Sequence, residues 1–257
     1  MKETLVAVNW DYSALAANYD DRADYDSRLI TEVFRSHCLP KSSRVLDLGA
    51  GTGKLTKELV KQGVNTIASE PNDAMREIGA RNVSLESCKW INSPGESIAL
   101  GDASIDSVWF GSSFNVMQHA VLFKELKRVM TDNAWLTCLW NHRDLNDKVQ
   151  KQVESVITSQ IPNYEYGSRR QDPTEILMKT GMFDKVHHFH SGFKVVIPVA
   201  TYVNAWKSHA TLQRQCRSGR QFQQIVKSIE NLLKSEASIT VPYSTTLWTT
   251  KRIARKQ

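Results

Sequence analysis

A carboxylate followed by three alternating glycines is the pattern in this 257-residue sequence that points most directly to chemistry. Residues 45–53 read Val-Leu-Asp-Leu-Gly-Ala-Gly-Thr-Gly, so the apolar residues of a buried strand lead directly into a glycine turn. Lys54 opens a segment with helical apolar spacing, which ends at Gly63. A strand, a glycine turn and a helix in this order let a ligand approach backbone N–H groups at the helix N-terminus.

Three kinds of ligand could use such a turn. A phosphate-binding P-loop needs Ser or Thr after its Gly-Lys pair, but Leu55 follows Lys54. A dinucleotide-binding turn needs its third glycine one residue later than Gly53. A carboxylate at Asp47 would also repel a pyrophosphate, at a cost of roughly 1 kcal/mol or more. The same carboxylate suits a ligand that carries a positive amino group.

The Asp-x-Gly-x-Gly-x-Gly pattern resembles motif I of the class I S-adenosylmethionine-dependent methyltransferases and matches it completely. Residues 44–143 are similar to the small-molecule branch related to the ubiquinone-biosynthesis and trans-aconitate methyltransferases. The resemblance implies that the cofactor is S-adenosyl-L-methionine and that its methionine amino group lies at Asp47. It also implies that the turn contacts the methionine and ribose portion through Gly49, Ala50, Gly51 and Gly53.

A second acidic residue supports this interpretation. Glu70 lies 23 residues after Asp47, at the end of a strand predicted over 65–69. In nucleoside-binding α/β folds a carboxylate at this place accepts hydrogen bonds from ribose hydroxyls. A glycine-rich turn that binds no ligand is the alternative for the first motif. By family resemblance Met75 lies near the adenine, and Pro71 joins the cofactor-binding set.

Two later segments complete the predicted cofactor site. Residues 93–98 resemble a family segment, Gly-x-Ala-Glu-x-Leu, whose backbone meets the adenine edge. The resemblance implies cofactor contacts from Pro94, Gly95 and Glu96. Ser112 follows the predicted fourth strand at 107–110, and ligands collect at such strand ends in open α/β sheets.

The residues predicted to act on the methyl acceptor come from separate stretches. Near the N-terminus, residues 16–22 resemble a family segment that covers the cofactor, which makes Tyr19 a cofactor-binding and a catalytic candidate. Tyr12 is a second catalytic candidate, because its ring could line an apolar pocket and stabilise positive charge. The alternative for both tyrosines is ordinary packing of an N-terminal helix on the core. After the fourth strand, Asn115 can orient a substrate by hydrogen bonds. His119 can act as a base, and the alternative is a surface or capping histidine. The residues predicted to face the substrate, rather than only to pack, are Trp140, Arg143, Trp206 and His209.

The elements that position these residues alternate between strands and helices, which predicts an α/β fold. We expect a seven-stranded Rossmann-like sheet, mostly parallel with an antiparallel last strand, together with a helical lid and cap. The expected divisions are an N-terminal helical lid, a cofactor-binding core, a helical cap insertion, and a last core strand with a basic tail, at residues 1–40, 41–199, 200–242 and 243–257. Within them we predict strands at 183–190 and 193–199 and helices at 201–209 and 219–236.

Composition narrows the class of protein further. Hydrophobic residues make up 41% and charged residues 23%, as in globular proteins, and no apolar stretch is long enough to predict a membrane span. Four dispersed cysteines and an N-terminus without a secretion signal favour a reduced, cytoplasmic protein. His187, His188 and His190 lack nearby acidic or cysteine partners, so no metal site is predicted.

The net charge of +6 is concentrated in residues 131–257, which hold 18 Lys/Arg and 10 Asp/Glu. This asymmetry suggests an anionic partner such as RNA, but no nucleic-acid motif accompanies it, and solvated helix faces are the favoured alternative. We therefore predict methyl transfer to an N or O atom of a small-molecule metabolite by in-line displacement, giving S-adenosyl-L-homocysteine. The alternatives are an RNA methyltransferase that uses the basic C-terminal half and a non-catalytic S-adenosylmethionine-binding protein. Oligomerisation stays open.

Overall fold

The computed structural model describes residue 13 and residues 15–167 and 171–254. In this part of the chain seven strands form one sheet in the order β3-β2-β1-β4-β5-β7-β6. β7 runs antiparallel to β5 and β6, and the other neighbouring pairs are parallel. This arrangement confirms the predicted fold. The strands are β1 Arg44–Leu48, β2 Asn65–Ser69, β3 Lys89–Ile91, β4 Ile105–Gly111, β5 Met130–Arg143, β6 His187–Pro198 and β7 Ser238–Lys251.

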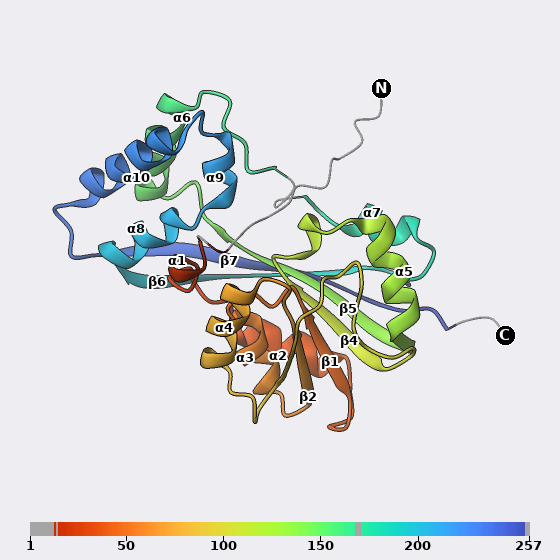
Figure 1. Ribbon diagram of the computed structural model, residues 1–257. Coiled ribbons are helices and arrows are strands. Elements are labelled where there is room, and N and C mark those ends of the chain that lie inside the picture. Colours follow the sequence, from red (N-terminus) through yellow and green to blue (C-terminus); the bar gives the residue numbers. More distant parts are fainter. Residues whose placement is uncertain (1–12, 14, 168–170, 255–257) are drawn as a thin grey trace.

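Helices connect the strands and cover the sheet (Figure 1). Five of them begin where a side chain caps the first turn, as the Asn72 and Asp147 side chains do by accepting hydrogen bonds from backbone N–H groups. The helices are α1 Ala16–Tyr19, α2 Ser27–Ser36, α3 Lys54–Val60, α4 Asp73–Asn82, η1 Phe114–Val116, α5 His119–Val129, α6 Lys148–Gln160, α7 Thr174–Lys179, α8 Val199–Lys207, α9 Ala210–Gln215 and α10 Gly219–Leu233. None of them is both long and apolar enough to cross a membrane.

The central strands are buried on both faces, which explains their near-continuous apolar sequence. Leu46 and Val108 pack with α5 in one hydrophobic cluster, whereas Val45 and Trp109 pack with α2 and α3 in another. β1 pairs in parallel with both β2 and β4, which brings the carboxyl ends of these strands to one edge of the sheet.

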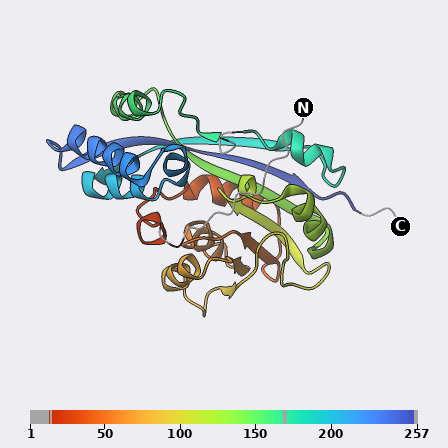
Figure 2. The same ribbon diagram turned by 45° about the horizontal axis from the view of Figure 1, so that its top comes forward.

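The cap has its own hydrophobic core. Apolar side chains from α6, α8, α9, α10 and the distal ends of β6 and β7 form a separate buried cluster. Figures 1 and 2 show these helices gathered at one end of the sheet, beyond the long strands β6 and β7. The cap therefore includes α6, which lies outside the predicted insertion at 200–242.

The C-terminal strands differ from the predicted ones in length. A single strand, β6, replaces the two strands predicted at 183–190 and 193–199, because Gly192 keeps its pairing with Ser244 and the ladder continues through it. Phe183 makes only an isolated bridge to Arg252. β7 begins at Ser238 rather than near 243, because the hairpin ladder with β6 extends into the cap.

Candidate functional site

The glycine turn after β1 has the conformation that its sequence predicts. Gly49, Gly51 and Gly53 all have positive φ angles, of 75°, 57° and 84°. A side chain is also excluded sterically at the first of them, because a Cβ on Gly49 would lie 2.6 Å from Cβ of Ser113. The N–H groups of Gly49 and Ala50 donate to the carbonyl of Ser69, which ties the turn to the end of β2. Gly49 and Gly51 also line a cavity at this edge of the sheet, which is described below.

Asp47 lies beneath this turn and is fully buried. Its Oδ2 accepts a hydrogen bond of 2.7 Å from the Thr56 hydroxyl, and its Oδ1 has no hydrogen-bond partner among the described residues. Burial raises the pKa of Asp47 to about 7, and the nearby Glu70 charge acts in the same direction. Asp47 does not line a described cavity, so its contact with a methionine amino group stays a prediction.

Glu70 lies at the end of β2 and is held by the backbone. The Gly51 N–H donates to its Oε2 and the Asn72 N–H to its Oε1, both at 2.9 Å. Burial raises the pKa of Glu70, although these two hydrogen bonds favour the charged form. Each carboxylate oxygen can accept more than one hydrogen bond, so the fixed side chain can still receive ribose hydroxyls.

A cavity of about 470 Å³, here called the turn cavity, opens beside Glu70. This volume is within the range of small-ligand sites. Ten of the predicted cofactor residues line the turn cavity: Tyr19, Gly49, Gly51, Glu70, Pro71, Met75, Pro94, Gly95, Glu96 and Ser112. The other three, Asp47, Ala50 and Gly53, belong to β1 and the turn but are not in its wall.

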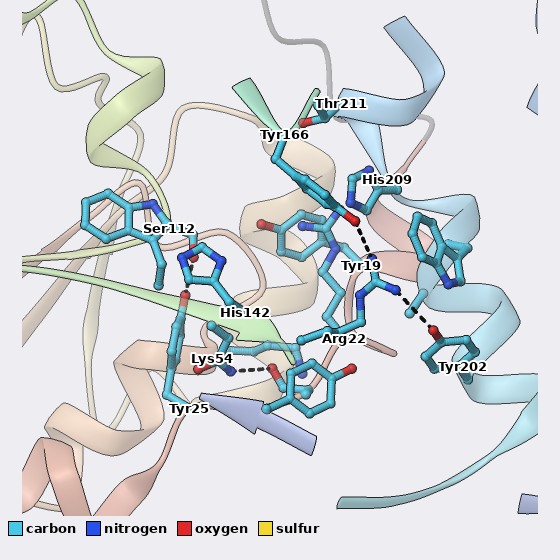
Figure 3. Close-up of a pocket in the computed structure, with 17 residues that line it drawn as sticks. Tyr19, Arg22, Tyr25, Lys54, Ser112, His142, Tyr166, Tyr202, His209 and Thr211 are labelled. Carbon is cyan, nitrogen blue, oxygen red and sulfur yellow. Dashed lines mark hydrogen bonds between the residues drawn. The ribbon is translucent and has the colours of Figure 1, made fainter. Parts of the chain in front are cut away.

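A second cavity, of about 160 Å³, lies between the N-terminal segment and the cap and is here called the lid–cap cavity. Its wall includes all four predicted substrate residues, Trp140, Arg143, Trp206 and His209. Figure 3 shows Tyr25, Ser112 and His142 on one side of this cavity, and Tyr166, Tyr202 and His209 on the other. The structure therefore brings residues of β5 and the cap together, although they are far apart in sequence.

The two cavities share two residues, Tyr19 and Ser112. Ser112 has a positive φ of 62°, which is uncommon for a residue with a side chain and is found at functional sites. Its hydroxyl lies 3.0 Å from the Tyr25 hydroxyl and its N–H donates to the Leu139 carbonyl. These contacts hold the strained residue at the junction, so molecules bound in the two cavities would meet there.

Two predicted catalytic residues lie away from this junction. His119 donates from Nε2 to the Phe114 carbonyl at 3.1 Å and stacks on the Phe114 ring, with ring centres 4.5 Å apart. Burial lowers its pKa. Neither His119 nor Asn115, which is in η1, lines either cavity. The fourth candidate, Tyr12, lies outside the described residues.

Comparison with known proteins identifies the domain around the turn. A family model described as a methyltransferase domain matches residues 46–138, which run from β1 into β5. The chain contains a methyltransferase domain. The predicted resemblance to class I methyltransferases is therefore confirmed for this segment.

The relatives of this methyltransferase domain share only part of the chain. An uncharacterized methyltransferase of Mycobacterium bovis is 36% identical over 107 residues, which are 41% of this chain and 43% of that protein. The ubiquinone/menaquinone biosynthesis C-methyltransferase of Zymomonas mobilis is 28% identical over 132 residues, 48% of this chain and 52% of that protein. The chain spans about half the length of the curated relatives it matches.

The fold continues beyond the matched segment. The structure of a candidate type II methyltransferase from Anaeromyxobacter dehalogenans superposes with a TM-score of 0.66 at 15% identity and covers 91% of this chain and 99% of that one. At this low identity the likeness shows the fold alone. It therefore extends the methyltransferase fold over the cap and the C-terminal strands, where the family model does not match.

Several wall residues were not among the predicted site residues. In the lid–cap cavity they include Arg22, Tyr25, Tyr166 and Tyr202, and in the turn cavity Met117. Single tyrosines and arginines in helices and loops carry no motif, so only their convergence in three dimensions marks them. The sequence gave one indication that Arg22 lies near the site, because Arg22 is the last residue of segment 16–22, which resembles a family segment that covers the cofactor.

Proposed function

We propose that this chain transfers a methyl group from S-adenosyl-L-methionine to an N or O atom of a small metabolite. The observation that carries the proposal is the pair of cavities that meet at Tyr19 and Ser112, at the strand ends of a methyltransferase domain. A donor in one cavity and an acceptor in the other would be aligned for an in-line displacement. Such alignment supplies much of the catalysis when the donor is already activated.

The turn cavity fits the cofactor chemically. Glu70 is a buried carboxylate with fixed orientation for the ribose hydroxyls, and Met75 and Pro94 provide apolar surface for adenine. A Cβ at Gly95 would come within 2.5 Å of the Met117 sulfur, so glycine keeps this wall open. When bound, S-adenosyl-L-methionine supplies an electrophilic methyl carbon on a sulfonium. The chain itself binds, orients and excludes water.

The lid–cap cavity favours a small acceptor. The Arg22 side chain donates to the Ser208 hydroxyl at 3.0 Å and to the Ser208 carbonyl, which ties the N-terminal segment to the end of α8 across 186 residues. Helix α1 also packs against α8. These contacts between the N-terminal segment and the cap cover the lid–cap cavity. They would have to separate before a nucleotide within a folded RNA could enter it.

The test is calorimetric titration of the purified chain with S-adenosyl-L-methionine, followed by transfer of a tritiated methyl group to a small-molecule library. We expect binding in the wild type and about ten- to hundredfold weaker binding in Glu70→Gln, because a hydrogen bond to a charged group contributes about 1.5–3 kcal/mol. Glu86→Gln, at an exposed position in the α4–β3 connection, is the matched control. A folded protein that does not bind the cofactor would refute the proposal, and methyl transfer to tRNA alone would favour the RNA alternative.

A further inference from the structure

Ser112 has a backbone conformation that its residue type does not favour. Among the described residues, four that are not glycine have a positive φ, and Ser112, at 62°, is the one of them that lines the turn cavity and the lid–cap cavity. A Cβ destabilises this conformation, whereas glycine adopts it freely. Gly49 and Gly51, which also have positive φ angles, line the same turn cavity. A serine where glycine would fold more easily points to a function for its hydroxyl.

The Ser112 hydroxyl is held in place by Tyr25. The two hydroxyl oxygens are 3.0 Å apart, and Figure 3 shows the hydrogen bond between them on one side of the lid–cap cavity. A Cβ on Gly111 would lie 3.1 Å from the Tyr25 hydroxyl, so this glycine leaves room for the phenol at the end of β4. The Ser112 N–H donates to the Leu139 carbonyl of β5 at 2.9 Å. Two separate elements therefore fix the backbone and the side chain of Ser112.

The pair of hydroxyl groups can attract an electropositive group but does not remove a proton at neutral pH. Burial raises the pKa of Tyr25, so its phenol stays protonated and is a poor nucleophile that does not compete for the methyl group. Whichever hydroxyl donates within the pair, the serine oxygen keeps a lone pair outside that hydrogen bond. Ser112 therefore contributes a fixed dipole, with oxygen as its negative end, to the wall that the two cavities share.

The group that crosses this shared wall in the proposed reaction is attached to a cation. With the donor in the turn cavity and the acceptor in the lid–cap cavity, the methyl group would pass between them at Tyr19 and Ser112. Its sulfur is a positively charged sulfonium before transfer and a neutral thioether afterwards. A preorganised oxygen dipole at this place therefore stabilises the methyl donor more than the demethylated product.

We propose that the Ser112 hydroxyl contacts the sulfonium methyl group and makes the site prefer S-adenosyl-L-methionine over S-adenosyl-L-homocysteine, and that Tyr25 is the residue that positions this hydroxyl. This inference rests on the proposed function. It gives the strained serine a role that glycine cannot fill, because glycine has no side-chain oxygen. The preference also helps the product to leave, because the favourable contact is lost once the methyl group has been transferred.

The experiment needs no methyl acceptor. Calorimetric titration with S-adenosyl-L-methionine and with S-adenosyl-L-homocysteine gives two dissociation constants for the wild type and for each variant. Ser112→Ala and Ser112→Gly both remove the hydroxyl, but only Ser112→Gly also relieves the backbone. In both variants the ratio of the homocysteine Kd to the methionine Kd should fall about three- to tenfold, the size expected for one lost hydrogen-bond-like contact. Tyr25→Phe keeps the hydroxyl but frees its rotation, so the ratio should fall about twofold.

Urea unfolding of the same variants separates this role from a structural one. Ser112→Gly should unfold at a higher urea concentration than Ser112→Ala, because only the alanine keeps a Cβ at a positive φ. Ala103→Gly is the matched control, at an exposed residue with a φ of 44° that lines neither cavity. It should also unfold at a higher urea concentration than the wild type, but its ratio of dissociation constants should equal that of the wild type.

Several outcomes would overturn this inference and leave the proposed function intact. An unchanged ratio in Ser112→Ala, or equal weakening of both ligands, would show that the hydroxyl does not contact the sulfonium methyl group. A lower ratio in Ser112→Gly alone would trace the effect to the backbone and not to the hydroxyl. An unchanged ratio in Tyr25→Phe would contradict the positioning role of Tyr25. A folded wild type that binds neither ligand would instead contradict the proposed function itself.

Discussion

Replacing Asp47 by Asn should stabilise the ligand-free protein, and more strongly at pH 8 than at pH 5. The Asp47 carboxyl is fully buried, and its Oδ1 has no hydrogen-bond partner among the described residues. Burial raises its pKa from 3.8 to about 7. In the unfolded chain the carboxyl ionises near pH 4, whereas in the folded protein it does so near pH 7. The folded state therefore loses stability as the pH rises from about 4 to about 7, and the loss is complete above that range.

The size of the effect follows from the pKa difference. One pKa unit corresponds to about 1.36 kcal/mol, so the full shift corresponds to about 4 kcal/mol above pH 7. Integrating the linkage relation between pH 5 and pH 8 leaves about 3 kcal/mol of that loss in this interval. Asn has nearly the same volume as Asp and keeps an oxygen that can accept the Thr56 hydroxyl. The stabilisation by Asp47→Asn should therefore grow by about 3 kcal/mol over this interval.

Urea unfolding of both proteins at pH 5 and pH 8, with circular dichroism as the signal, measures this difference. The relevant quantity is the free energy of unfolding of the variant minus that of the wild type. This difference is needed because burial also raises the pKa of Glu70, so the pH dependence of wild-type stability includes contributions from both carboxyl groups. Glu86→Gln removes an exposed carboxylate and is the control. An equal difference in unfolding free energy at the two pH values, or a variant less stable than the wild type at pH 8, would refute the reasoning.

Three further predictions follow from the geometry. Gly49→Ala should lower the free energy of unfolding by about 1–3 kcal/mol, because residue 49 has a positive φ and the added Cβ would collide with Ser113. Gly101→Ala is the control and should leave the free energy of unfolding unchanged, because a Cβ at Gly101 has no heavy atom within 4 Å. Denaturant titration of the two variants measures this difference. Burial lowers the pKa of His37 to about 3, so the stability of the wild type falls as the pH drops below 6.5. In the same assay, the free energy of unfolding of His37→Phe relative to the wild type should be about 2 kcal/mol higher at pH 5 than at pH 8. Glu70→Gln should weaken S-adenosyl-L-homocysteine binding about ten- to hundredfold at pH 8, and equal calorimetric affinities would contradict the predicted ribose contact.

The order of elements in the core could be predicted because local sequence determines it. Alternating apolar strands and amphipathic helices predict the βαβ units, and helix caps and glycines mark their ends. The C-terminal strands were predicted less well. Gly192 suggests from the sequence that one strand ends and another begins, but in the structure β6 continues through Gly192 because its pairing with β7 is uninterrupted there. Likewise α6 joins the cap because its apolar face, including Val153 and Ile157, packs on α8 and α10, which sequence periodicity does not reveal.

The cofactor side of the site was visible in the sequence for a physical reason. Three glycines with positive φ and an acid at the end of the next strand are requirements of one βαβ unit, so their spacing is short and fixed. Tertiary structure alone decided the other side. Burial determines the protonation of Asp47, and packing of the N-terminal segment on the cap brings Arg22 to Ser208 across 186 residues. Contacts so distant in sequence depend on how whole helices pack, and this packing forms the lid–cap cavity.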